Sequence, residues 1–141
     1  MQTACIAPLH VFSLGSWQID RKSCLVGLKE KVGSDLWIVR SSCLREDSID
    51  SSNAGAFLSV LNVDSAGLEK AIERVFAAYG EADISDEVLI QPMLTHVVRS
   101  GVAFSHDPNT CAPYRVVNWT DGSDTAEVTG GLGGRVWQQA A

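Results

Sequence analysis

The sequence predicts an α+β fold, with a mixed or antiparallel sheet and two main helices. Two segments, 17–32 and 64–80, place apolar residues three and four positions apart, which is the spacing of amphipathic helices. Several shorter apolar runs, each bounded by polar or turn-forming residues, are typical of strands. The resulting order β-α-β-β-α-β-β-β-β indicates α+β. The 141 residues suit one domain or part of one, and a hydrophobic content of 45% allows a core.

The first predicted elements are a short strand and a helix. Residues 6–12 are expected to form an edge strand, because Pro8 is tolerated only at an edge. Ser16 is the expected N-cap of the helix 17–32, and Gly33 is expected to end it. The apolar stripe of this helix comprises Trp17, Cys24, Leu25, Leu28 and Val32.

A strand, a long polar loop, a strand and the second helix follow. The strand is expected at 36–40 and the loop at 41–56, a length that is often functional inside a compact domain. The next strand is expected at 56–63, with Phe57, Ser59, Leu61 and Val63 alternating along it. The second helix then starts at Asp64 or Ser65, ends at Gly80, and has the apolar stripe Leu68, Ala71, Ile72, Val75 and Phe76.

The last third of the chain predicts four strands. The first is a buried strand, Val88-Leu89-Ile90, which Pro92 ends or kinks because proline has no backbone donor. The others are expected at 100–105, 114–119 and 126–128. The glycines between 130 and 134 are expected to form a flexible turn or a fraying end rather than a phosphate loop. No Lys-Ser/Thr pair and no helical pattern follow them.

Composition argues against several classes of protein. The formal net charge is −6, whereas a nucleic-acid surface needs a basic stripe. No apolar run approaches the roughly 18 residues of a membrane span, and the N-terminus lacks a signal-peptide pattern, so we expect a cytoplasmic protein. The four cysteines form no Cys-x-x-Cys pair and are expected to be reduced. The three histidines lack metal-ligand spacing, so no metal site is predicted in this chain.

The central candidate for function is the strand end Ile38-Val39-Arg40 with the polar loop behind it. Arginine offers a planar fork of donors that suits phosphate oxygens, and serine hydroxyls with glycine backbone can close on the same anion. The alternative is that Arg40 pairs with Glu46 or Asp47. The pattern alone favours this ordinary surface ion pair.

Two blocks of sequence resemble a known family. The run "VRSSCLREDSIDSSNAGAFLSVLNV" is similar to the ATP-binding domain of the phosphoenolpyruvate synthase and pyruvate phosphate dikinase family, which carries Val-Arg-Ser-Ser, a Glu-Asp pair and a Ser-Phe-Ala-Gly loop. Here Asn53 replaces the usual Phe of that loop. The block "VLIQPMLTHVVRSGVAFSHDP" resembles the family's Val-Gln-x-Met-Val and Ser-Gly-Val-x-Phe-Thr-x-x-Pro. The similarity is strongest over residues 36–108 and extends more weakly to about 131.

The resemblance implies a single, partial ATP-grasp nucleotide-binding domain over residues 1–141. It places Arg40 on the triphosphate, Gly55 in the loop that closes over it, and Ser59 where the family has a nucleotide-contacting Thr. It places Gln91 and the backbone of Met93 beside the adenine. From the residues alone, Gln91 could instead satisfy neighbouring loop backbone.

Several motifs of the family are missing from this sequence. There is no Gly-Gly-Lys motif, no phosphorylated histidine, and neither the acidic Mg²⁺ ligands nor the Gln-x-Arg strand. The resemblance implies a phosphotransferase that passes a phosphoryl group from ATP to a histidine on another domain. Because phosphoryl transfer needs metal ions and cationic clamps, we expect this chain by itself to be inactive, with its Mg²⁺ ligands elsewhere in a parent enzyme.

Two other interpretations stay open. In one, the chain is a truncated, non-catalytic module that binds a nucleotide or a protein. In the other, it is a structural domain whose exposed half-cleft makes it a homodimer.

Overall fold

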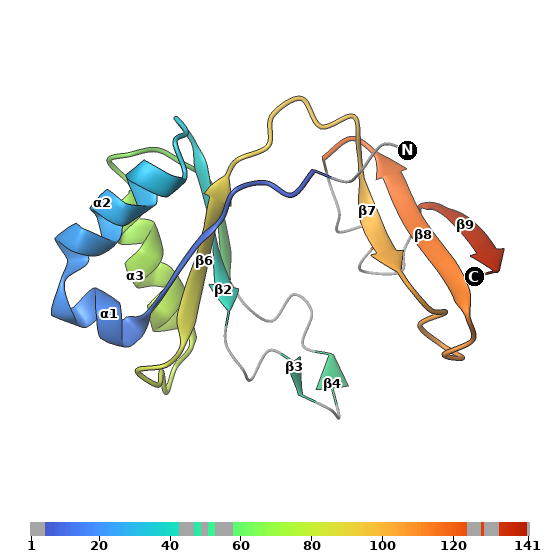
Figure 1. The fold of residues 1–141 in the computed structure, drawn as a ribbon, viewed down its shortest axis with the longest axis horizontal. Helices are drawn as coiled ribbons and strands as arrows, with labels where there is room; N and C mark the ends of the chain where they lie inside the picture. The colour runs from blue at the N-terminus through green and yellow to red at the C-terminus, as the bar shows by residue number, and fades with distance from the viewer. Residues whose placement is uncertain are drawn as a thin grey trace. The chain divides into compact units, whose positions relative to one another are not determined.

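The computed structural model describes residues 5–42, 47–48, 51–52, 58–123, 128 and 133–140. The chain divides into two compact units, Met1–Met93 and Leu94–Ala141 (Figure 1). Both units contain antiparallel sheets, and the helices α1, α2 and α3 lie in the first unit. The predicted α+β class is confirmed.

The first unit is a four-stranded antiparallel sheet with helices on one side (Figure 1). The strand order is β1-β6-β2-β5. Two very short strands, β3 and β4, pair with each other separately. The elements are β1 (His10–Ser13), α1 (Leu14–Ile19), α2 (Arg21–Lys31), β2 (Trp37–Ser42), β3 (Asp47–Ser48), β4 (Ser51–Ser52), β5 (Ser59–Val63), α3 (Leu68–Ala78) and β6 (Glu87–Pro92).

Two helical crossovers build this sheet. β1 and β2 are both antiparallel to β6, so they are parallel to each other with β6 between them, and α1 and α2 connect them. In the same way α3 connects β5 to β6 across β2. Because each crossover returns over the same sheet, the helices stack side by side on one face.

The first predicted helix is in fact two helices. Ser13, rather than Ser16, caps α1, because its hydroxyl accepts a hydrogen bond from the Ser16 N–H. Asp20 interrupts the helix and caps α2, accepting from the Ser23 N–H at 3.0 Å and from the Ser23 hydroxyl at 2.7 Å. Both bonds lower the pKa of Asp20 below its usual value, and the bond from the Ser23 backbone N–H has the larger effect. A short acidic side chain prefers such a cap to a helix interior, which explains the break.

The second predicted helix is confirmed as α3. All five residues of the predicted stripe are buried against the sheet. The helix begins after Gly67, whose N–H donates to the Asp64 carboxylate at 2.7 Å. It ends before Gly80, which takes a positive φ of 69°. Glycine adopts this left-handed conformation without steric cost, so it stops the helix as expected.

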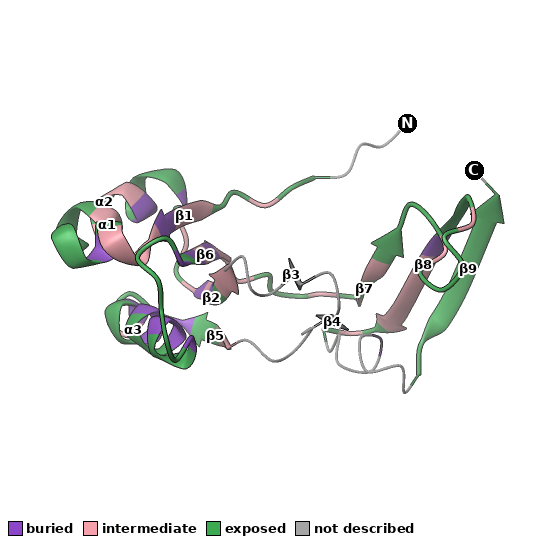
Figure 2. Ribbon diagram, turned by 90° about the horizontal axis from the view of Figure 1, so that it is seen from below, coloured by how far each residue is buried: buried purple, intermediate pink, exposed green. Residues whose placement is uncertain are grey.

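The core lies between the helices and one face of the sheet. Figure 2 shows the buried positions of this unit on α3, on α2 and on the central strands β2 and β6. Phe12 stacks on Trp17 with ring centroids 5.6 Å apart. The buried cluster comprises Phe12, Trp17, Leu28, Val32, Trp37, Val39, Val63, Leu68, Ala71, Ile72, Val75, Phe76, Tyr79, Val88 and Ile90.

The second unit is a three-stranded meander of β7 (Arg99–Phe104), β8 (Tyr114–Asp121) and β9 (Arg135–Ala140). The first two strands are confirmed. The sequence predicted no strand after the glycines, so the expectation of a fraying end is wrong for Arg135–Ala140, which pairs with β8 throughout. Of the strand predicted at 126–128, only Val128 is described. It is buried and helical, so the predicted strand is wrong at this position.

Candidate functional site

The candidate nucleotide site is the open face of the four-stranded sheet. In β2, Val39 points into the core, and its neighbour Arg40 therefore lies on the opposite face. The same alternation in β6 buries Ile90 and turns Gln91 to the face that bears no helix. The helices α1, α2 and α3 pack on the other face of the sheet (Figure 1).

Strand register brings three predicted site residues together on that face. Arg40 lies directly opposite Ser59 of β5 on one side and opposite Leu89 of β6 on the other. Directly opposed residues have Cβ atoms about 5 Å apart. Gln91 follows Leu89 by two residues, about 7 Å along β6. Arg40 and Ser59 are exposed and Gln91 is half-buried.

A β-bulge decides which way Ser59 points. Val63 pairs with Trp37 and Val60 pairs with Val39, so β5 has one more residue than β2 in this interval. Asn62 lies within the bulge and has a positive φ of 53°. The predicted alternation placed Ser59 on the same face as Val63. This prediction is wrong, because the bulge turns Ser59 to the open face.

Tyr79, which sequence analysis did not single out, fixes the end of β2 where the polar loop starts. Its hydroxyl accepts from the Ser42 N–H at 2.9 Å and donates to the Glu87 carbonyl. The ring is 8% exposed and belongs to the core. Tyr79 continues the apolar stripe of α3 by one turn, a signal that was present in the sequence. The partners of its hydroxyl depend on tertiary structure.

The remaining predicted contacts are less defined. Gly55, and Glu46 as a partner of Arg40, lie outside the described residues, and the side chain of Asp47 is not described. The N–H of Met93 donates to the Leu36 carbonyl at 2.9 Å. That backbone donor is therefore engaged within the unit.

A metal-ligand set is absent from the part of the chain that the structure describes. No three His, Cys, Asp or Glu side chains come together among those residues. The three described cysteines, Cys5, Cys24 and Cys111, are free thiols. Burial raises the pKa of Cys24, with Asp20 adding a smaller effect. In the described ranges, no helix is long and apolar enough to cross a membrane.

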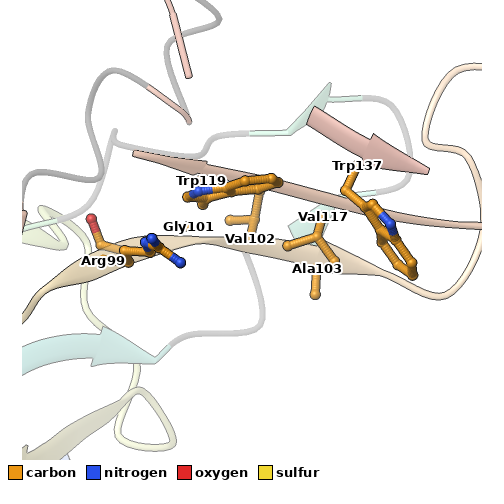
Figure 3. Close-up of a pocket in the computed structure, with 8 residues that line it drawn as sticks. Arg99, Gly101, Val102, Ala103, Val117, Trp119 and Trp137 are labelled. Carbon is orange, nitrogen blue, oxygen red and sulfur yellow. The ribbon is translucent and has the colours of Figure 1, made fainter. Parts of the chain in front are cut away.

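The second unit has a separate hollow on one face of its sheet. Its volume is about 460 Å³, and the indoles of Trp119 and Trp137 line it together with smaller side chains such as Ala103 and Val117 (Figure 3). Gly101 permits this packing, since a Cβ there would overlap the Asn118 carbonyl oxygen. None of the predicted site residues lines this hollow, which is formed by Arg99, Ser100, Gly101, Val102, Ala103, Val117, Trp119 and Trp137.

Comparison with known proteins identifies the family. The sequence matches the family model "Pyruvate phosphate dikinase, AMP/ATP-binding domain" over residues 22–137, which is most of the chain and spans parts of both units. The chain belongs to this family. No curated protein matches the sequence. The match confirms the resemblance seen in the Val-Arg-Ser-Ser and Ser-Gly-Val blocks, and the α+β architecture is consistent with a partial ATP-grasp-like domain.

Proposed function

We propose that this chain is the ATP-binding part of a phosphoenolpyruvate synthase or pyruvate phosphate dikinase-like phosphotransferase. Such an enzyme would pass a phosphoryl group from ATP to a histidine on a domain outside this chain. The observation that carries the proposal is the convergence of Arg40, Ser59 and Gln91 on the open face of the first unit's sheet. The family match supplies the nucleotide class.

The proposed binding mode follows the order of groups across that face. The Arg40 guanidinium contacts the triphosphate, because its fork of N–H donors matches phosphate oxygens. The Ser59 hydroxyl, directly opposite, donates to the same phosphates, and the loop around Gly55 closes over them. Further along β6, the Gln91 amide and the Met93 carbonyl contact the adenine.

We assign Mg²⁺ and catalysis to residues outside this chain, because the sequence lacks the acidic Mg²⁺ ligands of the family. Bound Mg²⁺ would neutralise phosphate charge during transfer. We therefore propose that the chain binds ATP in the cytoplasm, that its partners are the remaining domains of a parent enzyme, and that it is inactive alone.

Calorimetric titration of the chain with ATP tests the proposal. Arg40→Ala should weaken ATP binding by about tenfold or more, since a charge-assisted hydrogen bond contributes about 1.5–3 kcal/mol. Arg74→Ala is the matched control, because Arg74 is exposed on α3, which lies on the other side of the sheet. Equal affinity in wild type and Arg40→Ala would remove Arg40 from the site. Equal weakening of ATP binding in both variants would show that the loss comes from the lower net charge and not from a contact of Arg40.

The second candidate is a non-catalytic module that binds a nucleotide or a protein, favoured because the sequence lacks the family's Gly-Gly-Lys motif and acidic Mg²⁺ ligands. An immunoblot of the source cells with an antibody against this chain separates the two. A band much larger than 15.1 kDa supports the ATP-binding part of a whole enzyme. A band at 15.1 kDa supports the module.

A further inference from the structure

The side chains of β5 change face near the end of the strand. At its start, Leu58 and Val60 pack against the core of the first unit, and at its end Val63 is only 6% exposed. Val60 and Val63 are three residues apart, yet both face the core. In a regular strand, only residues separated by an even number of positions share a face. One extra residue must therefore lie between them.

Strand pairing and backbone conformation identify this extra residue. Between the paired positions of β2 and β5, Leu61 and Asn62 share the place opposite Ile38. Of these two residues, Asn62 has the positive φ, 53°. A residue in this left-handed conformation begins one common class of β-bulge. Asn62 is therefore the residue that makes the bulge.

The amino acid at position 62 suits this conformation. Asparagine is several-fold enriched among non-glycine residues with positive φ, and glycine takes this conformation without steric cost. A β-branched residue such as valine is strongly disfavoured there, because its Cβ comes too close to the backbone carbonyl oxygen. Without the bulge, β5 would shift by one residue against β2, and Ser59 would turn to the core in place of Val60.

We propose that Asn62 is a positioning residue for the candidate ATP site. Its left-handed backbone maintains the bulge, and the bulge keeps the Ser59 hydroxyl on the open face, directly opposite Arg40. Asn62 acts through the strand and needs no contact of its own with ATP. The inference rests on the proposed function, in which Ser59 contacts the phosphates of ATP.

A cysteine introduced at position 59 reports which face that position occupies. In the Ser59→Cys chain, the new thiol should react rapidly with a maleimide, because Ser59 is exposed. Mass spectrometry of the labelled peptide measures the rate. Adding Asn62→Val should slow the reaction several-fold, since the thiol turns toward the core, whereas adding Asn62→Gly should leave the rate unchanged. Equal rates in all three chains would show that Asn62 does not set the face of this position.

Calorimetric titration with ATP tests the consequence for the site. Ser59→Ala should weaken ATP binding by about tenfold, since a hydrogen bond to a charged group is lost. Asn62→Val should weaken it by a similar factor, whereas Asn62→Gly, which keeps the conformation, should bind ATP as the wild type does. The double variant Ser59→Ala with Asn62→Val should lose much less than the product of the two single losses, because Asn62 acts through Ser59.

His96→Val is the matched control for backbone strain. His96 has a positive φ of 58° and is exposed in the second unit. The same change of residue type there should leave both the ATP affinity and the thiol reaction at position 59 unchanged. Weaker ATP binding in this control would show that strain anywhere in the chain lowers the affinity, and would remove the role of Asn62.

Each other outcome also overturns the inference. Normal ATP affinity in Asn62→Val, fully multiplicative losses in the double variant, or weakening by Asn62→Gly would each exclude positioning by the backbone of Asn62. If Arg40→Ala weakens ATP binding and Asn62→Val does not, this inference fails and the proposed function stands. A wild-type chain that does not bind ATP overturns both.

Circular dichroism checks that each variant keeps its fold. If Asn62→Val does not fold, Asn62→Ala replaces it in both measurements. Alanine is not β-branched, so it is less strained at this φ than valine but more strained than glycine. The thiol reaction and the ATP affinity should then change in the same direction by smaller factors, and no change in either would overturn the inference.

Discussion

The two units use the same kind of sheet but differ in what covers it. The first unit packs three helices on one face and holds the whole buried cluster of the described residues. In the second unit, Val116 and Val128 are the buried hydrophobic residues among those described. Strand pairing alone does not make a core, because each strand presents side chains to two faces and both need cover. The first unit should therefore resist unfolding more than the second.

The largest effect is expected from Ile72→Ala. Ile72 on α3 is fully buried, so the truncation should reduce the free energy of unfolding by about 2–5 kcal/mol. Val136→Ala in β9 is the matched change in the second unit. Because Val136 is largely exposed, its effect should stay within about 0.5 kcal/mol. Urea denaturation of both variants measures this difference, and similar losses would show that the second unit also has a tight core.

Gly101→Ala tests the close approach of β7 and β8 in the second unit. The new Cβ would meet backbone, the Asn118 carbonyl oxygen, which cannot give way as a side chain can. We expect a loss of about 1–3 kcal/mol from overpacking, confined to the second unit. Amide hydrogen exchange should show faster exchange in β7 and β8 and unchanged protection in β2 and β6. Gly33→Ala is the control, because nothing lies within 4 Å of its added Cβ.

Tyr79→Phe tests the hydrogen bonds that connect the core of the first unit to the end of β2, beside the candidate site. The change leaves the Ser42 N–H and the Glu87 carbonyl without the hydroxyl that bridges them. We expect a loss of about 1 kcal/mol in stability and faster amide exchange at the end of β2. Unchanged exchange at Ser42 would show that this hydrogen bond does not hold the strand end.

His10 gives the smallest expected effect, and only at low pH. The ring packs over Gly27 of α2, and burial, with Lys31 as a smaller cause, lowers the pKa of His10 below its usual 6.5. The unfolded chain therefore takes up the proton more readily than the folded chain. The stabilising contribution of neutral His10 is complete above pH 6.5. It is lost as the pH falls through 6.5 toward the pKa of His10 in the folded chain.

The measurement compares urea midpoints of wild type and His10→Gln at about pH 7.5 and about pH 5.5. The variant should lose less stability on acidification than the wild type. His106→Gln, an exposed position in the second unit, is the control and should follow the wild type. Identical acid sensitivity in all three proteins would exclude His10 as a source of pH dependence.

The sequence by itself determined the family, the fold class and the best-defined helix. The Val-Arg-Ser-Ser and Ser-Gly-Val blocks identified the family, because a motif of specific residues at fixed spacing can be recognised without knowing the fold. The stripe of α3 was predicted residue by residue, since helical periodicity is local and every apolar position in it is buried.

Tertiary structure decided the features that depend on neighbouring strands. The bulge in β5, which turns Ser59 to the face of Arg40, is a property of the β2–β5 pairing and leaves no periodic signal. The partners of the Tyr79 hydroxyl lie on two different strands, Ser42 on β2 and Glu87 on β6. β9 was missed because its residues are exposed on both faces and show no alternation, so only pairing with β8 makes it a strand. Local patterns report burial, whereas register and edge pairing arise from contacts between distant segments.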